Sequence, residues 1–101
     1  MIDLDDIEII EGETTCTTKQ YYEAIQRSIN AGMWGLQGSY GRVMMDAIKS
    51  GHCLLGQNDA YDYWGTHIPS RDQVQAGTKG SFDFVAEENG EEWAQHMSEV
   101  I

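Results

Sequence analysis

Apolar side chains recur at helical spacing in the first half of the chain. They stand three or four positions apart at Tyr22, Ile25, Ile29 and Met33. This spacing places them on one face of a helix. Thr17 followed by Gln20 matches a capping box, in which the two side chains satisfy backbone N–H groups at a helix start. These signals predict a helix over residues 18–32.

A second helical stripe follows the glycine-rich stretch "GMWGLQG". Its apolar residues are Tyr40, Val43, Met44, Ala47 and Ile48. They predict a helix over residues 39–50. Because the connection between the two helices is short, we expect them to pack as a helical hairpin. Trp34 and Leu36 would then fill the turn of this hairpin.

Shorter signals mark both ends of the chain. Ser81 can cap a short helix that runs through Val85, and Asn89 with Glu92 matches the start of a last helix. The apolar face of this last helix would hold Trp93, Ala94, Met97 and Ile101. Near the N-terminus, the alternating sequence "IEI" at residues 7–9 fits a short strand.

The stretch "NDAYDYWGTHIPSRDQVQAGTKGS", residues 58–81, has no sustained period. Loops of this length in a small domain are usually functional or packed by their own side chains. We therefore predict that Trp64 is buried against the helix at 39–50. The charged residues would form an exposed rim that binds a partner, with Tyr61 able to serve either side: Asp59, Asp62, Arg71 and Lys79.

Length and composition fit one folded unit. The chain has 101 residues, and 41% of them are hydrophobic, which is enough for a single packed core. We predict a single domain over residues 1–101, mainly α, with a helical hairpin, a long packed loop and a C-terminal helix. The acidic segment 1–13 is where we expect the least order.

Charge is distributed unevenly along the chain. The net charge is −11, and residues 1–13 and 83–101 each carry −6 without any base, while the middle carries +1. Such a surface repels phosphate backbones and anionic lipid, so we expect neither direct nucleic-acid binding nor membrane binding. A basic protein is the favoured partner, and the predicted contacts are Glu87, Glu88, Glu91 and Glu92. Simple solubility is the alternative explanation of this charge.

The remaining composition points to the cytoplasm. No run of eighteen apolar residues is present, and the N-terminus has acids where a signal peptide needs bases. Cys16 and Cys53 form no CxxC pair, which suits a reducing compartment and leaves a disulfide between them open.

Candidate catalytic and metal-binding residues are few. His52, His67 and His96 lack the spacing of closed zinc sites, so we expect no metal and no cofactor. A Cys53 nucleophile with His67 and Asp59 or Asp62 can be drawn, but Cys53 begins an apolar run and we expect no enzyme. The sequence "AGTKGS" lacks a Walker pattern, although Lys79 before a helix start can hold an anion.

Four glycines recur every three residues, at positions 32, 35, 38 and 41. Gly41 lies inside the predicted helix at 39–50, where glycine costs about 1 kcal/mol relative to alanine. A close helix contact would offset this cost. Core packing is one interpretation of these glycines, and homodimerisation is the other.

Three stretches of the chain resemble a group of small tailed-bacteriophage proteins with no established activity. They are "WGLQGSYGRVMMDAIKSGHCLLG", "DYWGTHIPSRDQVQAGTKGSFDFV" and "GEEW", and they lie between Trp34 and Trp93. Residues 1–20 do not match this pattern. The resemblance implies a phage origin and carries no activity with it.

Phage origin and acidity together suggest a role inside an infected host cell. We expect a cytoplasmic, non-enzymatic protein that binds and inhibits or redirects a host nucleic-acid-handling or defence protein, in an anti-CRISPR or anti-restriction manner. Its partner would carry a basic nucleic-acid-binding surface. One alternative is an accessory or structural phage protein. Another is a small enzyme or nucleotide binder built around His52, Cys53, His67 and Lys79.

Overall fold

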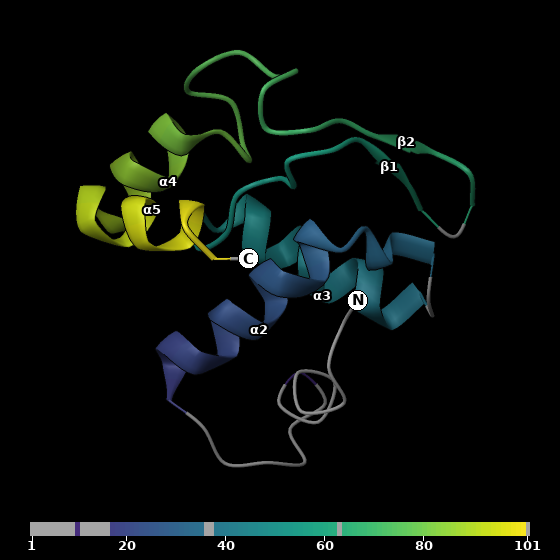
Figure 1. Ribbon diagram of the computed structural model, residues 1–101, viewed down its shortest axis with the longest axis horizontal. Coiled ribbons are helices and arrows are strands. Elements are labelled where there is room, and N and C mark those ends of the chain that lie inside the picture. The colour runs from purple at the N-terminus through teal and green to yellow at the C-terminus, as the bar shows by residue number, and fades with distance from the viewer. Residues whose placement is uncertain (1–9, 11–16, 36–37, 63, 101) are drawn as a thin grey trace.

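Helices make up most of the computed structural model, which describes residues 10, 17–35, 38–62 and 64–100. The helical elements are α2 (Thr18–Asn30), the 3₁₀ helix η1 (Met33–Gly35), α3 (Gly38–Lys49), α4 (Phe82–Asn89) and α5 (Glu91–Ser98). The strands β1 (Ala60–Tyr61) and β2 (His67–Ile68) pair in an antiparallel hairpin (Figure 1). The mainly α prediction is confirmed. The strand predicted at residues 7–9 lies outside the described residues.

The first two predicted helices are present and pack against each other. Thr17 Oγ1 accepts a hydrogen bond from Gln20 N at 3.1 Å, and Gln20 Oε1 accepts one from Thr17 N at 2.9 Å, so the capping box is confirmed. Helix α2 ends two residues earlier than predicted, and Gly32 follows with a φ of +71°. Trp34 is buried in the turn before α3, as predicted. Leu36 lies outside the described residues.

Helices α4 and α5 form a second, tightly packed helical hairpin. Ser81 Oγ accepts a hydrogen bond from Phe84 N at 3.2 Å and caps α4 as predicted. The predicted Asn89 cap of α5 is wrong, because Gly90 precedes α5 with a φ of +96° and no side chain caps this helix. Asn89 instead donates to Gly51 O at 2.7 Å, just beyond the end of α3.

Two hydrophobic clusters form the core, and one extended segment runs between them. The larger cluster lies around α2, η1 and α3, and the smaller one consists of Leu54, Val85, Ala94 and Met97. Cys53 and Leu55 belong to the larger cluster, whereas Leu54 belongs to the smaller one. Side chains that alternate in this way are expected of extended backbone, whose successive residues point to opposite sides.

A buried glutamine of α2 holds this extended segment. Gln26 Oε1 accepts a hydrogen bond from Leu54 N at 2.8 Å, and Gln26 Nε2 donates to Leu54 O at 3.0 Å. Nε2 also donates to Asn30 Oδ1 at 3.0 Å. The side-chain amide therefore pairs with both backbone groups of Leu54, as a neighbouring strand would, where water cannot take its place.

Arg71 extends the same network into the long loop. Its Nε donates to Leu55 O at 2.8 Å, its Nη2 to Asn30 Oδ1 at 3.2 Å, and its Nη1 to Ser98 O at 3.4 Å. The prediction that Arg71 lies on an exposed rim is wrong. The guanidinium has a fixed fork of donors, and here it satisfies acceptors from three separate segments of the chain.

Polar contacts hold the described residues of the long loop in place. Strand pairing joins Ala60 with Ile68 and Tyr61 with His67. Beyond the hairpin, Gln73 Oε1 accepts a hydrogen bond from Ser70 N at 2.9 Å and closes a turn. Leu55 N donates to Gly80 O at 3.0 Å and fixes the far end of the loop.

The first prediction concerns Gln26. Replacing Gln26 with alanine leaves the buried N–H and C=O of Leu54 without partners, which costs about 2–4 kcal/mol of unfolding free energy. The matched control is Gln95→Ala on the exposed face of α5, expected to change it by less than about 0.5 kcal/mol. Urea denaturation followed by circular dichroism measures both. Equal losses in the two variants would contradict this account of the core.

The second prediction concerns Arg71. Arg71→Ala removes donors from three carbonyl or amide oxygens and is expected to cost about 2–3 kcal/mol. Lys79→Ala, at an exposed position of the same loop, is expected to stay within about 0.5 kcal/mol. The same denaturation experiment compares them, and a fully stable Arg71→Ala variant would refute a structural role for this side chain.

Candidate functional site

The residues predicted to bind a partner lie on two separate surfaces. Asp59, Tyr61 and Asp62 belong to the β1–β2 hairpin, at one end of the molecule in Figure 1. Four predicted contacts lie on α4 and α5, at the other end: Glu87, Glu88, Glu91 and Glu92. Lys79 is exposed in the turn before α4. The chain therefore has two candidate interaction surfaces instead of one continuous rim.

The hairpin exposes two large aromatic side chains. Tyr61 is 62% exposed and Trp64 is 73% exposed, so the prediction that Trp64 is buried is wrong. Asp62 Oδ1 accepts hydrogen bonds from Trp64 N at 2.9 Å and Thr66 N at 2.8 Å, which fixes a tight turn. Trp34, which is only 3% exposed, already occupies the interior beside α3.

His67 supports the hairpin from its second strand. Its ring lies 5.5 Å from the Tyr61 ring, centroid to centroid, and its Nε2 lies 3.0 Å from Asp59 Oδ2. Both side chains are about half exposed, so this contact orients them more than it stabilises the fold. Asp59, Tyr61 and His67 thus form one ordered outer face of the hairpin.

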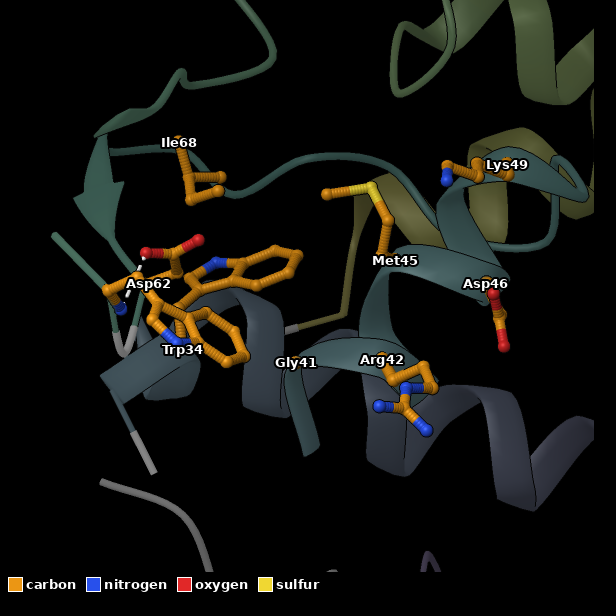
Figure 2. A pocket seen from close by; sticks show the side chains of 9 residues that line it. Trp34, Gly41, Arg42, Met45, Asp46, Lys49, Asp62 and Ile68 are labelled. Atoms are coloured by element: carbon orange, nitrogen blue, oxygen red, sulfur yellow. Dashed lines mark hydrogen bonds between the residues drawn. The ribbon is translucent and has the colours of Figure 1, made fainter. Parts of the chain in front are cut away.

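A pocket of about 260 Å³ lies between the hairpin and α3 (Figure 2). Trp34, Met45 and Ile68 supply its apolar walls, and Trp64 and Asp62 border it on the hairpin side. The α3 side carries three charged residues and one glycine: Arg42, Asp46, Lys49 and Gly41. Apolar walls with a few charged groups at the edge are the usual composition of a binding pocket.

Gly41 lines this pocket on the α3 side. A Cβ placed at Gly41 would meet no described atom within 4 Å. Packing of α3 against another described part of the chain therefore does not explain the glycine at this position. Glycine inside a helix costs about 1 kcal/mol relative to alanine, so Gly41 lowers the stability of α3. Homodimerisation through the glycine face stays a prediction.

The α4–α5 hairpin presents the acidic surface. All six of its carboxylates are exposed: Asp83, Glu87, Glu88, Glu91, Glu92 and Glu99. Three of them, Glu91, Glu92 and Glu99, line an open depression of about 560 Å³ together with Phe82, Gln95 and His96. Lys and Arg are absent from residues 82–100. The negative charge of this surface is therefore not balanced by any Lys or Arg of α4 or α5.

His96 ties the acidic hairpin to α2. Its Nε2 lies 2.6 Å from Glu23 Oε2. Trp93 adds a second tie, because its Nε1 donates to His52 O at 2.8 Å. These contacts fix the orientation of α5, so the exposed carboxylates are presented by a rigid element.

The residues considered for catalysis lie in different surroundings. Cys53 is fully buried and its Sγ donates to Tyr22 O at 3.5 Å. Burial raises the pKa of the Cys53 thiol far above its usual range, which disfavours the thiolate that a nucleophile requires. His67 faces Asp59, as described above. The Cys53–His67 arrangement drawn from the sequence is therefore not assembled.

His52 is likewise engaged in packing. Its ring stacks on Tyr22 with centroids 4.1 Å apart, and its Nδ1 lies 2.7 Å from Ser50 Oγ. Burial lowers the pKa of His52, so the neutral imidazole is favoured. Throughout the described ranges, no three His, Cys, Asp or Glu side chains gather in a way that would hold a metal ion. Cys16 lies outside those ranges, so its pairing stays open.

Sequence reasoning missed the pocket itself. Trp34 was predicted to fill the turn between the first two helices, and Met45 and Ile68 were assigned no role. Nothing in the spacing of these three residues predicts that the hairpin packs against α3. The one available signal was Gly41, a helical glycine at a position where the sequence offers no turn.

In the part of the chain that the structure describes, no helix combines the length and hydrophobicity needed to span a membrane.

Comparisons with known proteins do not assign a family. No family model, curated protein or solved structure matches this chain. The resemblance to bacteriophage proteins therefore stays a prediction from the sequence, and the candidate surfaces rest on their own geometry and charge.

The third prediction compares two tryptophans of the pocket. Trp34→Ala removes a buried indole and is expected to cost about 3–5 kcal/mol of unfolding free energy. Trp64→Ala removes an exposed indole and is expected to cost less than about 1 kcal/mol. Denaturant titration of the two variants tests the assignment. A larger loss for Trp64→Ala would mean that the hairpin aromatic is part of the core after all.

Proposed function

We propose that this protein is a non-enzymatic binding protein whose α4–α5 surface docks on the basic nucleic-acid-binding surface of a host protein. The observation that carries the proposal is the acidic depression, which Glu91, Glu92 and Glu99 line together with a half-buried Phe82 and without any Lys or Arg from α4 or α5. Carboxylates arranged around a hollow offer several acceptors to the Lys and Arg side chains that otherwise hold phosphates.

The physics of such docking favours fast and specific association. The net charge of −11 steers a cationic surface toward the protein before contact is made. The exposed carboxylates lie on two helices, so their backbone is already ordered before binding. Occupying the basic surface excludes nucleic acid from it. The partner is therefore a host nucleic-acid-handling or defence protein that is inhibited or redirected.

The proposed setting is the cytoplasm of an infected bacterial cell. It follows from the bacteriophage resemblance of residues 34–93 together with the acidic charge. A CRISPR effector, a restriction enzyme and a polymerase all carry basic grooves of the required kind. The proposal does not depend on which of these is the target.

The fourth prediction uses charge-matched variants. Glu91→Gln, Glu92→Gln and Glu99→Gln together should abolish capture of the partner from a bacterial host extract. The control carries Asp46→Asn, Asp59→Asn and Asp72→Asn, three exposed acids of other surfaces, and should capture the same protein. Mass spectrometry identifies the bound protein, and duplex DNA should elute it in competition.

Association kinetics give the decisive measurement. The rate constant for binding the captured protein should fall about tenfold or more between low and physiological salt for the unmodified chain. Equal capture by the two triple variants would refute a role for the depression. A rate constant independent of salt would refute electrostatic docking altogether.

A further inference from the structure

The pocket between the β1–β2 hairpin and α3 contains the elements of a cation-binding site. We propose that it binds the guanidinium side chain of an arginine on the surface of a protein partner. This site lies between the hairpin and α3, away from the acidic α4–α5 surface. Its chemistry can be tested without knowing the partner of that surface.

Two indole rings supply the aromatic part of the site. Trp34 is buried and forms part of the wall, whereas Trp64 borders the pocket with most of its side chain exposed. Tryptophan gives the strongest cation–π attraction of the aromatic side chains. A planar guanidinium stacks on an indole face better than a compact ammonium does, which favours arginine over lysine.

Asp62 supplies the charge, and its position is fixed before any ligand arrives. Its Oδ1 accepts the backbone N–H groups of Trp64 and Thr66 at 2.9 and 2.8 Å. The Oδ2 atom takes part in neither bond. Figure 2 shows Asp62 and Trp34 at one end of the pocket, with Asp46 and Lys49 at the other. A carboxylate held in this way meets a guanidinium without losing side-chain entropy on binding.

The apolar walls suit the stem of an arginine. Met45 and Ile68 line the pocket between the indoles and α3, and Figure 2 shows both side chains directed toward it. Long cationic side chains bury their methylene groups along apolar surfaces while the charged head contacts polar groups. Gly41 also lines the pocket on the α3 side.

An apolar occupant fits less well. A partner side chain without charge would cover the Asp62 carboxylate and remove water from it without providing a cation. Burying an unpaired charge in this way is costly, whereas an arginine replaces the lost water with charged N–H donors.

An anionic occupant is also disfavoured. Arg42 and Lys49 stand at the α3 end of the pocket, but Asp46 lies on the same helix one turn from Arg42. Those three residues sum to +1, and Asp62 balances them. The protein as a whole carries −11, which lowers the concentration of anions near its surface. The cation therefore binds at the Asp62 end, away from Arg42 and Lys49.

The site can be tested with the full chain and N-acetyl-arginine amide as the probe. The indole N–H signals of the three tryptophans are followed by NMR during the titration. We expect saturable shifts at Trp34 and Trp64 and none at Trp93, whose Nε1 is bonded to His52 O outside the pocket. N-acetyl-norleucine amide, which has an uncharged alkyl chain, should bind at least about threefold more weakly.

Asp62→Asn is the decisive variant. The asparagine Oδ1 can still accept both backbone N–H groups, so the turn is retained and only the charge is removed. We expect arginine amide to bind about three- to tenfold more weakly to it. Asp72→Asn makes the same change of charge at an exposed position outside the pocket and should bind within about twofold of the unmodified chain.

Three results would overturn the proposal. They are equal affinity for arginine and norleucine amides, equal effects of Asp62→Asn and Asp72→Asn, and shifts of the pocket signals by guanosine monophosphate but not by arginine amide. The variant with Glu91, Glu92 and Glu99 changed to glutamine should keep its affinity for arginine amide within about twofold. This variant therefore distinguishes a wrong proposal for the arginine site from a wrong proposal for the acidic docking surface.

Discussion

The buried side-chain amide of Gln26 is the contact on which the arrangement of this protein depends. It satisfies both backbone groups of Leu54 and so lets an extended segment run through the interior without a neighbouring strand. Asn30 and Arg71 continue the network to the long loop and to the last turn of the chain. Because a partly satisfied buried network costs more than an apolar core, its members must form together.

The positions of both candidate surfaces depend on this network. The β1–β2 hairpin leaves the interior after Gly56 and returns at Arg71, whose backbone N donates to Gly56 O at 2.8 Å. This bond closes the base of the hairpin. It therefore helps to fix the position of the hairpin's aromatic and acidic side chains relative to α3. The α4–α5 hairpin begins after Gly80, which is tied to Leu55. The side-chain hydrogen bonds of Gln26 satisfy backbone groups of Leu54 that a neighbouring strand would otherwise satisfy. The fold therefore needs only a small sheet.

The helices could be predicted because their signals are local. The Thr17 and Ser81 caps and the apolar stripes involve neighbours within one or two turns. The loop could not be predicted in the same way. The half-buried position of Arg71 depends on oxygens contributed by distant residues. The exposure of Trp64 accompanies a turn made by Asp62 and the burial of Trp34 beside α3. Loop sequences have no periodic pattern from which such long-range contacts can be predicted. The pocket between the hairpin and α3 was not predicted for the same reason.

The smaller hydrophobic cluster gives the acidic hairpin a degree of independence. Three of its four fully buried members, Val85, Ala94 and Met97, come from α4 and α5 themselves. Opening this unit also requires breaking its polar ties to the rest of the chain, among them Trp93 Nε1 to His52 O and His96 to Glu23. Repulsion among its own carboxylates then acts mainly on this opening equilibrium. A cationic surface that neutralises the carboxylates would hold the unit closed, so that recognition and local order in this part of the chain are thermodynamically linked.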